Sequence, residues 1–450
     1  MEAGIGIGGL SVGQDEVVQS SQFDLFSPVQ IESAYKERHE QFYHPTTNTD
    51  SAGPFKFDIP ADPEKFTDVQ SLRLMGAMRI VKKAGGGTAA TDYGVGDKVG
   101  VVNNWFQSLF QDIRVWVGDT QITDPAGNWY AYKSYFENLL SYTSAVKQGT
   151  MASRGFIPDT AGFFDKMDDT NAGWKKRMEI MGTSKWQYFC INLHSDITTL
   201  RKLLPPNLKL SLEIIRNPDK FTLMTEEVGT TPEIELKELK IKIVRFTASD
   251  TIKNFYNQKI SRGLNPMIPI DRSLIKTYTV QAGTTSLRKF NLISGNQLPD
   301  QILIAIVKES AYRGTKNENP FWFKNYDIGE ASLVVNGLHE PEQKYQMHVG
   351  DGDTENAYQD FLENIGIKTD DDHEIGINKE AYLKGNFILA WDRAKDKCNR
   401  YHRHRTGTGT IDVNITTRSQ LTATVTVIVY ATYSSDIMIE EGNKAVVAIF

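Results

Sequence analysis

Three glycines near the start of the chain form the first pattern whose spacing could do chemistry. Gly4, Gly6 and Gly9 match the loop that holds the pyrophosphate of a dinucleotide. Such a loop follows a strand and opens a helix, so that backbone N–H groups at the helix N-terminus face the phosphates. The residues around these glycines carry neither pattern. We therefore expect no bound cofactor, and the chain also lacks zincin, P-loop and nucleophile-elbow motifs, which predicts no catalytic residue.

Two acidic clusters suggest cation binding at first sight. The first begins like a calcium loop at Asp351, but Asn356 stands where the loop requires glycine and Leu362 stands where it requires a bidentate acid. The second runs from Asp370 to Glu374 and is typical of a solvated loop. The sequence therefore predicts no metal site.

A run of cations late in the chain is the strongest local concentration of charge. Its members are Arg393, Lys395, Lys397, Arg400, Arg403 and Arg405. Such a run suits contact with a polyanion or with an acidic neighbouring subunit, and it equally suits a charged loop between strands. The chain as a whole carries a net charge of −6, so we expect no sequence-specific binding to nucleic acid.

An internal repeat decides how these segments are organised. AYKSYFENL begins at Ala131, and AYQDFLENI begins at Ala357. The distance between the two copies is about half the length of the 450-residue chain. Self-similarity at this distance predicts two folding units of the same kind.

The surroundings of the two copies also match. Each copy follows a strand, a tight turn and a second strand, with the turns at Gly118-Asp119 and Asn336-Gly337. Each copy itself has the periodicity of a short amphipathic helix. The apolar positions are Tyr132, Tyr135, Phe136 and Leu139 in the first helix, and Tyr358, Phe361, Leu362 and Ile365 in the second. We interpret both stripes as core.

Alternating apolar and polar residues dominate the rest of the sequence. Residues 208–214 and 425–433 are clear examples, and a change of phase between Leu236 and Leu239 predicts a bulge in a long strand. Helical patterns are few and short, so the chain is predicted to be all-β. The long segments 144–185 and 337–385 favour jelly rolls over up-and-down barrels. Cys190, inside an apolar strand, is interpreted as a small core residue.

Composition shifts predict the domain limits. We expect an N-terminal arm at residues 1–34, a first jelly roll at 35–228 and a second at 229–450, with the boundary in the polar stretch 226–233. No stretch approaches the 18 apolar residues that suggest a transmembrane helix. Two cysteines and no secretory leader predict synthesis in a reducing compartment.

Eight blocks, in their order along the chain, resemble a known family. They are QFYHPTTNTDSAGPFKFDI (41–59), VVNNWFQSLFQDIRVWVGDTQI (101–122), YAYKSYFENLLSY (130–142), DTAGFFD (159–165), NAGWKKR (171–177), ISGNQLPDQILIAIV (293–307), NPFWFKNYDIGEASLVVNG (319–337) and TVTVIVYATYSSDIMIE (424–440). In these blocks the chain resembles the hexon-like, double-jelly-roll major capsid proteins of adintoviruses and Maverick/Polinton elements. The basic run and the glycine-opened N-terminus have no counterpart in the resemblance.

The resemblance implies two jelly rolls side by side, in a homotrimeric capsomer with a pseudo-hexagonal outline. It further implies neighbouring capsomers, penton proteins and minor capsid proteins as partners, and a place in the virion capsid after synthesis in the host cytoplasm. It implies no enzymatic activity.

Two other functions remain open from the residues alone. A glycan-binding jelly-roll module could use Trp174, Trp322 and Trp391 as stacking platforms, and a carbohydrate-active enzyme would need paired carboxylates on facing strands.

Overall fold

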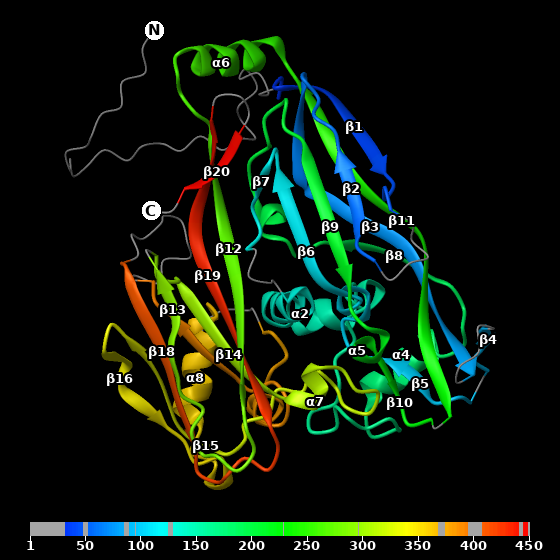
Figure 1. Cartoon of the computed structure of the whole chain (residues 1–450), viewed down its shortest axis with the longest axis vertical. Helices are drawn as coiled ribbons and strands as arrows, with labels where there is room; N and C mark the ends of the chain where they lie inside the picture. Colours follow the sequence, from blue (N-terminus) through cyan, green and yellow to red (C-terminus); the bar gives the residue numbers. More distant parts are fainter. Residues whose placement is uncertain are drawn as a thin grey trace, which may run out of the picture.

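The computed structural model describes residues 32–47, 53–84, 90–94, 96–124, 129–227, 229–295, 297–367, 374–394, 407–440 and 444–448. Most of them lie in antiparallel strands, and the strands form two groups of sheets that follow the two halves of the sequence (Figure 1). The predicted all-β class, with short helices in the connections, is confirmed.

Two sheets enclose the core of the first half. In order across the first sheet lie β1 (Tyr35–Tyr43), β11 (Thr230–Ala248), β3 (Lys65–Ala84) and β4 (Ala90–Asp92), and β8 (Gln187–Asn192) also pairs with β3. The second sheet contains β2 (Phe55–Ile59), β9 (Leu210–Arg216), β6 (Phe110–Val117) and β7 (Thr120–Gln121). Phe57, Leu74, Ile113 and Leu212 show how both sheets point alternate side chains into one core.

The second half repeats this plan. One sheet contains β12 (Met267–Val280), β19 (Val425–Glu440), β14 (Gln301–Lys308) and β17 (Ile388–Asp392), and β20 (Lys444–Ala448) also pairs with β19. The other contains β13 (Lys289–Gly295), β18 (Gly409–Thr417), β15 (Ile328–Val335) and β16 (Leu338–Gln346). A further pair, β5 (Val99–Val101) and β10 (Leu223–Thr225), belongs to neither half's main sheets.

Short helices occupy the connections. They are α1 (Trp105–Ser108), α2 (Tyr130–Ser141), α3 (Ser144–Gln148), η2 (Ala152–Arg154), α4 (Ala172–Met181), η3 (Asp196–Thr199), α5 (Asp219–Thr222), α6 (Asp250–Ser261), α7 (Glu309–Tyr312), η4 (Val349–Asp351), α8 (Glu355–Asn364) and α9 (Lys379–Leu383). Among the described residues, no helix has both the length and the apolar composition to cross a bilayer.

The internal repeat is confirmed as a repeat of structure. Strands β6 and β7 precede α2, and strands β15 and β16 precede α8. In the second copy Asn336 (φ 50°) and Gly337 (φ 87°) are both left-handed, which is the backbone that a two-residue hairpin turn requires. The predicted bulge is also present, because the pairing of β11 with β3 shifts register between Lys237 and Lys240.

The pairing of β11 moves the boundary between the halves. Residues 226–233 were expected to link two domains, but β11 begins at Thr230 and pairs with both β3 and β1. The strand therefore belongs to the first half, and the chain crosses to the second half after Ala248, through α6. Strand alternation alone could not reveal this, since a long strand reads the same whichever sheet receives it.

The position of Cys190 also differs from the expectation. Phe189 and Ile191 are buried, while Cys190 between them is exposed. Successive residues of a strand point to opposite faces, so the two flanking core residues place the cysteine on the outer face of the sheet.

Candidate functional site at the junction of the two halves

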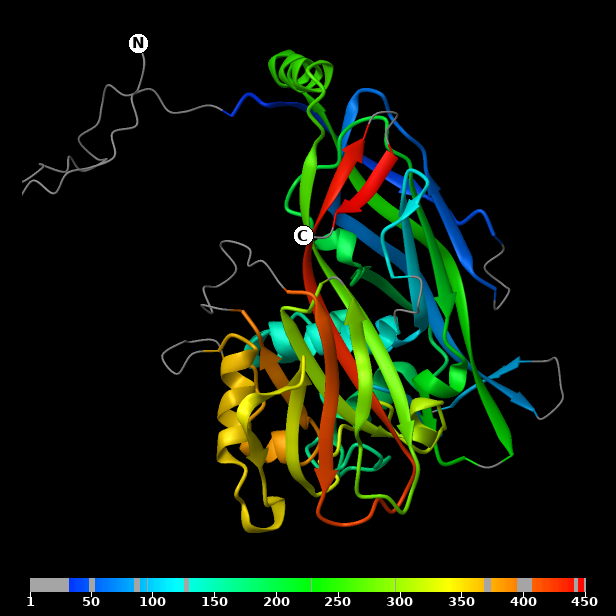
Figure 2. The ribbon, with the colours of Figure 1, turned by 60° about the vertical axis from the view of Figure 1, so that its left-hand side comes forward.

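Helix α2 lies between the two halves (Figures 1 and 2). Tyr135 stacks on Phe321 with ring centres 4.2 Å apart, and Phe136 stacks on Phe323 at 5.3 Å. Both phenylalanines follow β14 in the second half. The predicted apolar stripe is thus confirmed as core, but the core that it enters is that of the second half.

The exchange also runs in the opposite direction. Ile268 and Ile270 at the start of β12, with Ile437 and Ile439 at the end of β19, belong to the core of the first half. Each half therefore completes its core with residues of the other. Removing one half would expose apolar surface in the other, so the two halves should fold as one unit.

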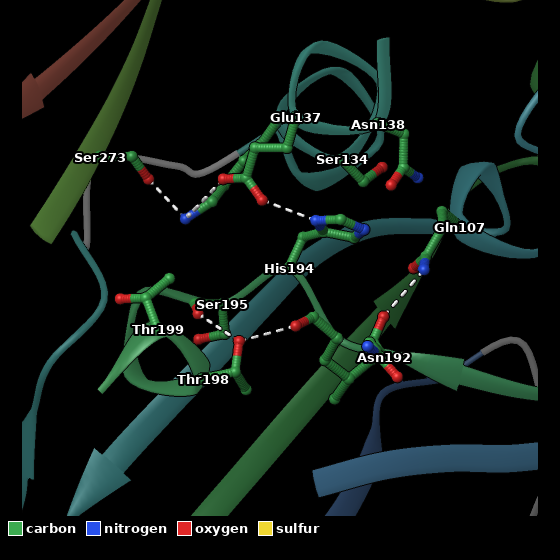
Figure 3. A network of polar contacts seen from close by, with 12 residues as sticks. Gln107, Ser134, Glu137, Asn138, Asn192, His194, Ser195, Thr198, Thr199 and Ser273 are labelled. Atoms are coloured by element: carbon green, nitrogen blue, oxygen red, sulfur yellow. Dashed lines mark hydrogen bonds and ion pairs between the residues drawn. The ribbon is translucent and has the colours of Figure 1, made fainter. Parts of the chain in front are cut away.

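The polar side of α2 carries a buried ion pair. Lys133 and Asp196 of η3 are 1% and 2% exposed and contact each other directly. Figure 3 shows the neighbouring side chains of Ser273 and Glu137. Ser273 of β12 completes the group: its backbone N–H donates to Asp196 at 3.1 Å, and its hydroxyl accepts from Lys133 at 2.6 Å. A buried charge is tolerated only with a partner and hydrogen bonds, and here Ser273 of the second half supplies hydrogen bonds to both charges.

Glu137, one turn along α2, extends this network. It pairs with His194 at 2.6 Å, lies 3.7 Å from Lys133, and accepts a hydrogen bond at 3.3 Å from Tyr430 of β19. Burial alone would raise the pKa of Glu137, but the Lys133 ammonium and the His194 contact outweigh burial and hold this pKa below its ordinary value. Burial likewise lowers the pKa of Lys133, and the carboxylates of Asp196 and Glu137 outweigh it and raise the pKa. Both groups therefore remain charged near neutral pH.

The serine, histidine and acidic residues of this cluster are not arranged as a catalytic triad. A hydrolytic triad needs a serine hydroxyl on a histidine that an acid orients. The Ser273 hydroxyl instead donates to Asp196 at 2.7 Å, and the buried Ser195 hydroxyl has no hydrogen-bond partner among the described residues. In the part of the chain that the structure describes, no group of three or more His, Cys, Asp or Glu side chains is placed to hold a metal ion. What the cluster can do is join elements of the two halves.

A second buried ion pair joins the halves at another point. Arg177 of α4 and Asp159 are both fully buried, 2.5 Å apart. Asn319, in the second half, donates its side-chain amide to Asp159 at 3.1 Å and its backbone N–H to Asp165 at 2.6 Å. Arg177 also donates to the backbone carbonyl of Val101 at 2.8 Å. The guanidinium and the carboxylate are thus held by fixed partners on several sides.

Lys147 of α3 provides a third link. Its ammonium donates to the carbonyls of Leu139 and Ile375, each at 2.5 Å, so it connects the end of α2 to the second half. Only 4% of the residue is exposed, and burial lowers the pKa of Lys147 to about 8.

The cations singled out in the sequence are not gathered into a described site. Arg393 pairs with Glu340 at 2.8 Å and donates to the carbonyl of Pro299 at 3.0 Å, so it is bound within its own half. Lys395, Lys397, Arg400, Arg403 and Arg405 lie outside the described residues, as do the acidic residues 370–373 and nearly all of the predicted arm.

The three tryptophans proposed as glycan platforms are buried or contacted by neighbouring side chains. Trp174 and Trp391 are 1% and 5% exposed. Trp322 lies beside a cavity of about 650 Å³, with Phe164 stacked at 5.9 Å and the Lys324 ammonium 3.5 Å from its ring centre. A sugar needs a free aromatic face, and these contacts leave no platform of that kind among the three.

The sequence and the structure of the chain were compared with those of known proteins. No family model matches the chain. An uncharacterized protein of Caenorhabditis elegans is 21% identical over 267 residues, which are 59% of this chain and 61% of that protein, so the match spans less than two thirds of that relative.

Solved structures match over almost the whole chain. A chain in the cryo-EM structure of the Sputnik virophage has a TM-score of 0.59 at 13% identity, covering 99% of this chain and 94% of its own. The Faustovirus major capsid protein has a TM-score of 0.56 at 8% identity, covering 92% of each chain, and the mavirus major capsid protein has 0.55 at 9%, covering 100% and 97%. The fold is a double jelly roll. The predicted fold class is confirmed, and α2 is the helix that lies between the two jelly rolls.

Sequence reasoning missed the residues that join the two jelly rolls. Asp159, Arg177 and Asn319 lie in three of the blocks that carried the resemblance, and the structure brings these blocks together. Lys133 lies inside the repeat, where the second copy has Gln359. Lys133 lies outside the predicted apolar stripe, and its partner Asp196 lies 63 residues further along the chain, so no sequence signal pointed to this pair.

Proposed function

We propose that this chain is a major capsid protein that builds the icosahedral shell of a double-stranded DNA virus or virus-derived element, of the adintovirus and Maverick/Polinton kind. The observation that carries the proposal is the full-length double jelly-roll fold, whose matches include the Faustovirus and mavirus major capsid proteins. The proposal assigns the chain no catalytic step and no cofactor. Its product is an assembly.

The two-jelly-roll plan supports a trimer as the building block. Three copies bring together six jelly rolls of similar size, which can occupy a position with six neighbours. The buried links at α2 and Arg177 suit this role, because they hold the two jelly rolls of one chain at a fixed angle. A capsomer whose jelly rolls moved independently would not present a constant outline to its neighbours.

Exposed apolar side chains on both jelly rolls are candidates for the contact between subunits. Tyr188 on the first is 65% exposed, and Phe290 and Leu338 on the second are 70% and 75% exposed. In a closed trimer the first jelly roll of one copy meets the second of the next, so surfaces on both halves are needed. Obligate interfaces of this kind bury more than about 2,000 Å².

Light scattering of the purified chain tests the trimer. We expect a trimer at micromolar concentration, with pseudo-hexagonal particles in negative-stain images. Tyr188→Lys and Phe290→Lys should shift the mass toward a monomer without lowering the unfolding temperature, and Ser153→Lys, at another exposed site, should leave the trimer intact. A wild-type chain that is a clean monomer would contradict the proposal.

Further partners follow from the same proposal. Neighbouring capsomers, penton proteins and minor capsid proteins would contact the trimer in a virion capsid, after synthesis in the host cytoplasm. The arm is assigned to assembly beyond the trimer. Deleting residues 2–20 should leave trimer unfolding unchanged and lower the yield of closed shells. Intact shells made from a destabilised trimer would show that the arm belongs to a jelly-roll core.

A glycan-binding module is the alternative function. Glycan-array binding by a small discrete oligomer that never forms pseudo-hexagonal particles would favour it. The covered faces of Trp174, Trp322 and Trp391 weigh against it.

A further inference from the structure

Helix α6, which carries the chain from one jelly roll to the other, presents apolar side chains to solvent. It lies at one end of the molecule (Figures 1 and 2). Ile252, Phe255 and Ile260 are 39%, 58% and 42% exposed, and none of the twelve residues of α6 is buried. A surface helix normally turns its apolar stripe toward a core, so an exposed stripe of this kind indicates a contact surface.

The same face of α6 also holds the helix to the first jelly roll, because Tyr256 falls between Ile252 and Ile260 around the helix axis. Tyr256 packs edge-on against Phe66 of β3 with ring centres 5.7 Å apart, and Lys253 lies 3.7 Å from Glu64. Phe255 and Ile252 lie beside these anchoring residues on the same helix. The helix therefore has a fixed orientation, and the exposed parts of Ile252, Phe255 and Ile260 remain available for a ligand.

The described N-terminal end of the chain lies at the first turn of this helix. The backbone N–H of Ser249, directly before α6, donates to the carbonyl of Ala34 at 2.8 Å. Lys36 pairs with Asp250 at 2.7 Å. Whatever precedes Glu32 therefore leaves the jelly roll next to the exposed stripe.

We propose that residues 23–31 of the same chain cover the apolar stripe of α6. This segment, FDLFSPVQI, contains Phe23, Leu25, Phe26, Val29 and Ile31 and only one charged residue. Nine extended residues span about 30 Å, whereas a twelve-residue helix is about 18 Å long, so the segment reaches every part of the stripe.

The short tether explains why the occupant is the chain's own arm. A segment joined within a few residues of its site has an effective concentration in the millimolar range, far above that of a separate partner. Weak apolar contacts are then sufficient for binding. The proposal does not depend on shell formation, and it assigns residues 23–31 to docking, so the deletion of residues 2–20 described above leaves the docking segment in place.

Chymotrypsin provides the test, because it cleaves after the aromatic residues of the segment. In the full-length chain we expect slow cleavage after Phe23 and Phe26. Phe255→Ser should accelerate this cleavage several-fold, since it removes the most exposed apolar group of the stripe. Asn257→Ser, on the same helix, is the matched control and should leave the rate unchanged. Equal rates in the wild type and in Phe255→Ser would overturn the proposal.

Two further measurements separate the same chain from a neighbouring copy and exclude an unfolded variant. Thermal unfolding of Phe255→Ser should match that of the wild type, and hydrogen exchange in α6 should become faster when residues 2–31 are deleted. Phe255→Ser chains co-expressed with chains that lack residues 2–31 should still be cleaved rapidly. Restored protection in that mixture would show docking on a neighbouring copy and would overturn docking within one chain.

Discussion

Helices α2 and α8 carry the same repeated sequence and have different surroundings. Helix α2 lies between the two jelly rolls, while α8 lies on the outer side of the second (Figures 1 and 2). Nine of the twelve residues of α2 are buried, including Lys133, but only Ala357, Phe361 and Asn364 are buried in α8. A repeated motif thus predicts the same local structure twice, and the neighbours decide how much of it becomes core.

Two polar positions of the repeat behave differently: one has the same role in both helices, and the other has a role only in α2. Asn138 and Asn364 occupy the same repeat position, and both are buried and hydrogen-bonded, to Asn104 at 3.0 Å and to the carbonyl of Ala390 at 2.8 Å. Lys133 and Gln359 also correspond, but the lysine is buried and ion-paired whereas the glutamine is exposed. The asparagine therefore stabilises a feature that both jelly rolls share, whereas Lys133 stabilises the junction between them.

The largest effect is expected from breaking either jelly-roll core. Leu210→Asp in the first and Val427→Asp in the second each place a charge where the native side chain is 2% or 0% exposed. An unpaired buried charge costs several kcal/mol, comparable with the stability of a whole domain. Because the two cores exchange residues, we expect either substitution to abolish folding of both halves. A soluble chain in which one half still unfolds cooperatively would show that the two cores do not depend on each other.

Exchanging the residues at the lysine position should reveal the difference between the helices directly. Lys133→Gln gives α2 the residue of α8 and leaves Asp196 buried without its cation, which should cost about 3–5 kcal/mol in urea unfolding. Gln359→Lys gives α8 the residue of α2 at an exposed site and should change stability by less than about 0.5 kcal/mol. Similar losses from both substitutions would mean that the two helices are not in different environments.

Trimming the apolar stripes should give a smaller contrast. Phe136→Ala removes a fully buried ring from the junction, at a cost of about 3–4 kcal/mol, whereas Leu362→Ala trims a half-buried side chain of α8 and should cost about 1–2 kcal/mol. Thermal unfolding of the two variants measures the difference. A larger loss of stability from Leu362→Ala would show that α8 contributes more to the stability of the chain than α2 does.

The smallest effect is expected in the pH dependence. The pKa of Glu137 is held below its ordinary value, so its contribution to stability is present above about pH 4.5 and is lost as the pH falls through the folded-state pKa. Glu137→Gln should therefore flatten the acid limb of the stability curve by a fraction of the loss expected for Lys133→Gln. Parallel acid limbs for the wild type and Glu137→Gln would show that other carboxyl groups carry the dependence.

Local sequence patterns were sufficient to predict the secondary structure of this protein. Period-two alternation fixed the strands, Asn336-Gly337 fixed a hairpin, and the repeat at Ala131 and Ala357 fixed the existence of two similar units. Strands and hairpin turns depend on the chirality and spacing of neighbouring residues, so a short segment is sufficient to predict them.

The way in which the two units join could not be predicted from these local patterns. The assignment of β11 to the first jelly roll and the pairing of Lys133 with Asp196 both depend on which distant segments meet. Lys133 is buried because the carboxylate of Asp196 compensates its charge, and one sequence does not reveal that partner. The identity of the strands was therefore a local property, and the rigid junction between the jelly rolls was a property of the whole fold.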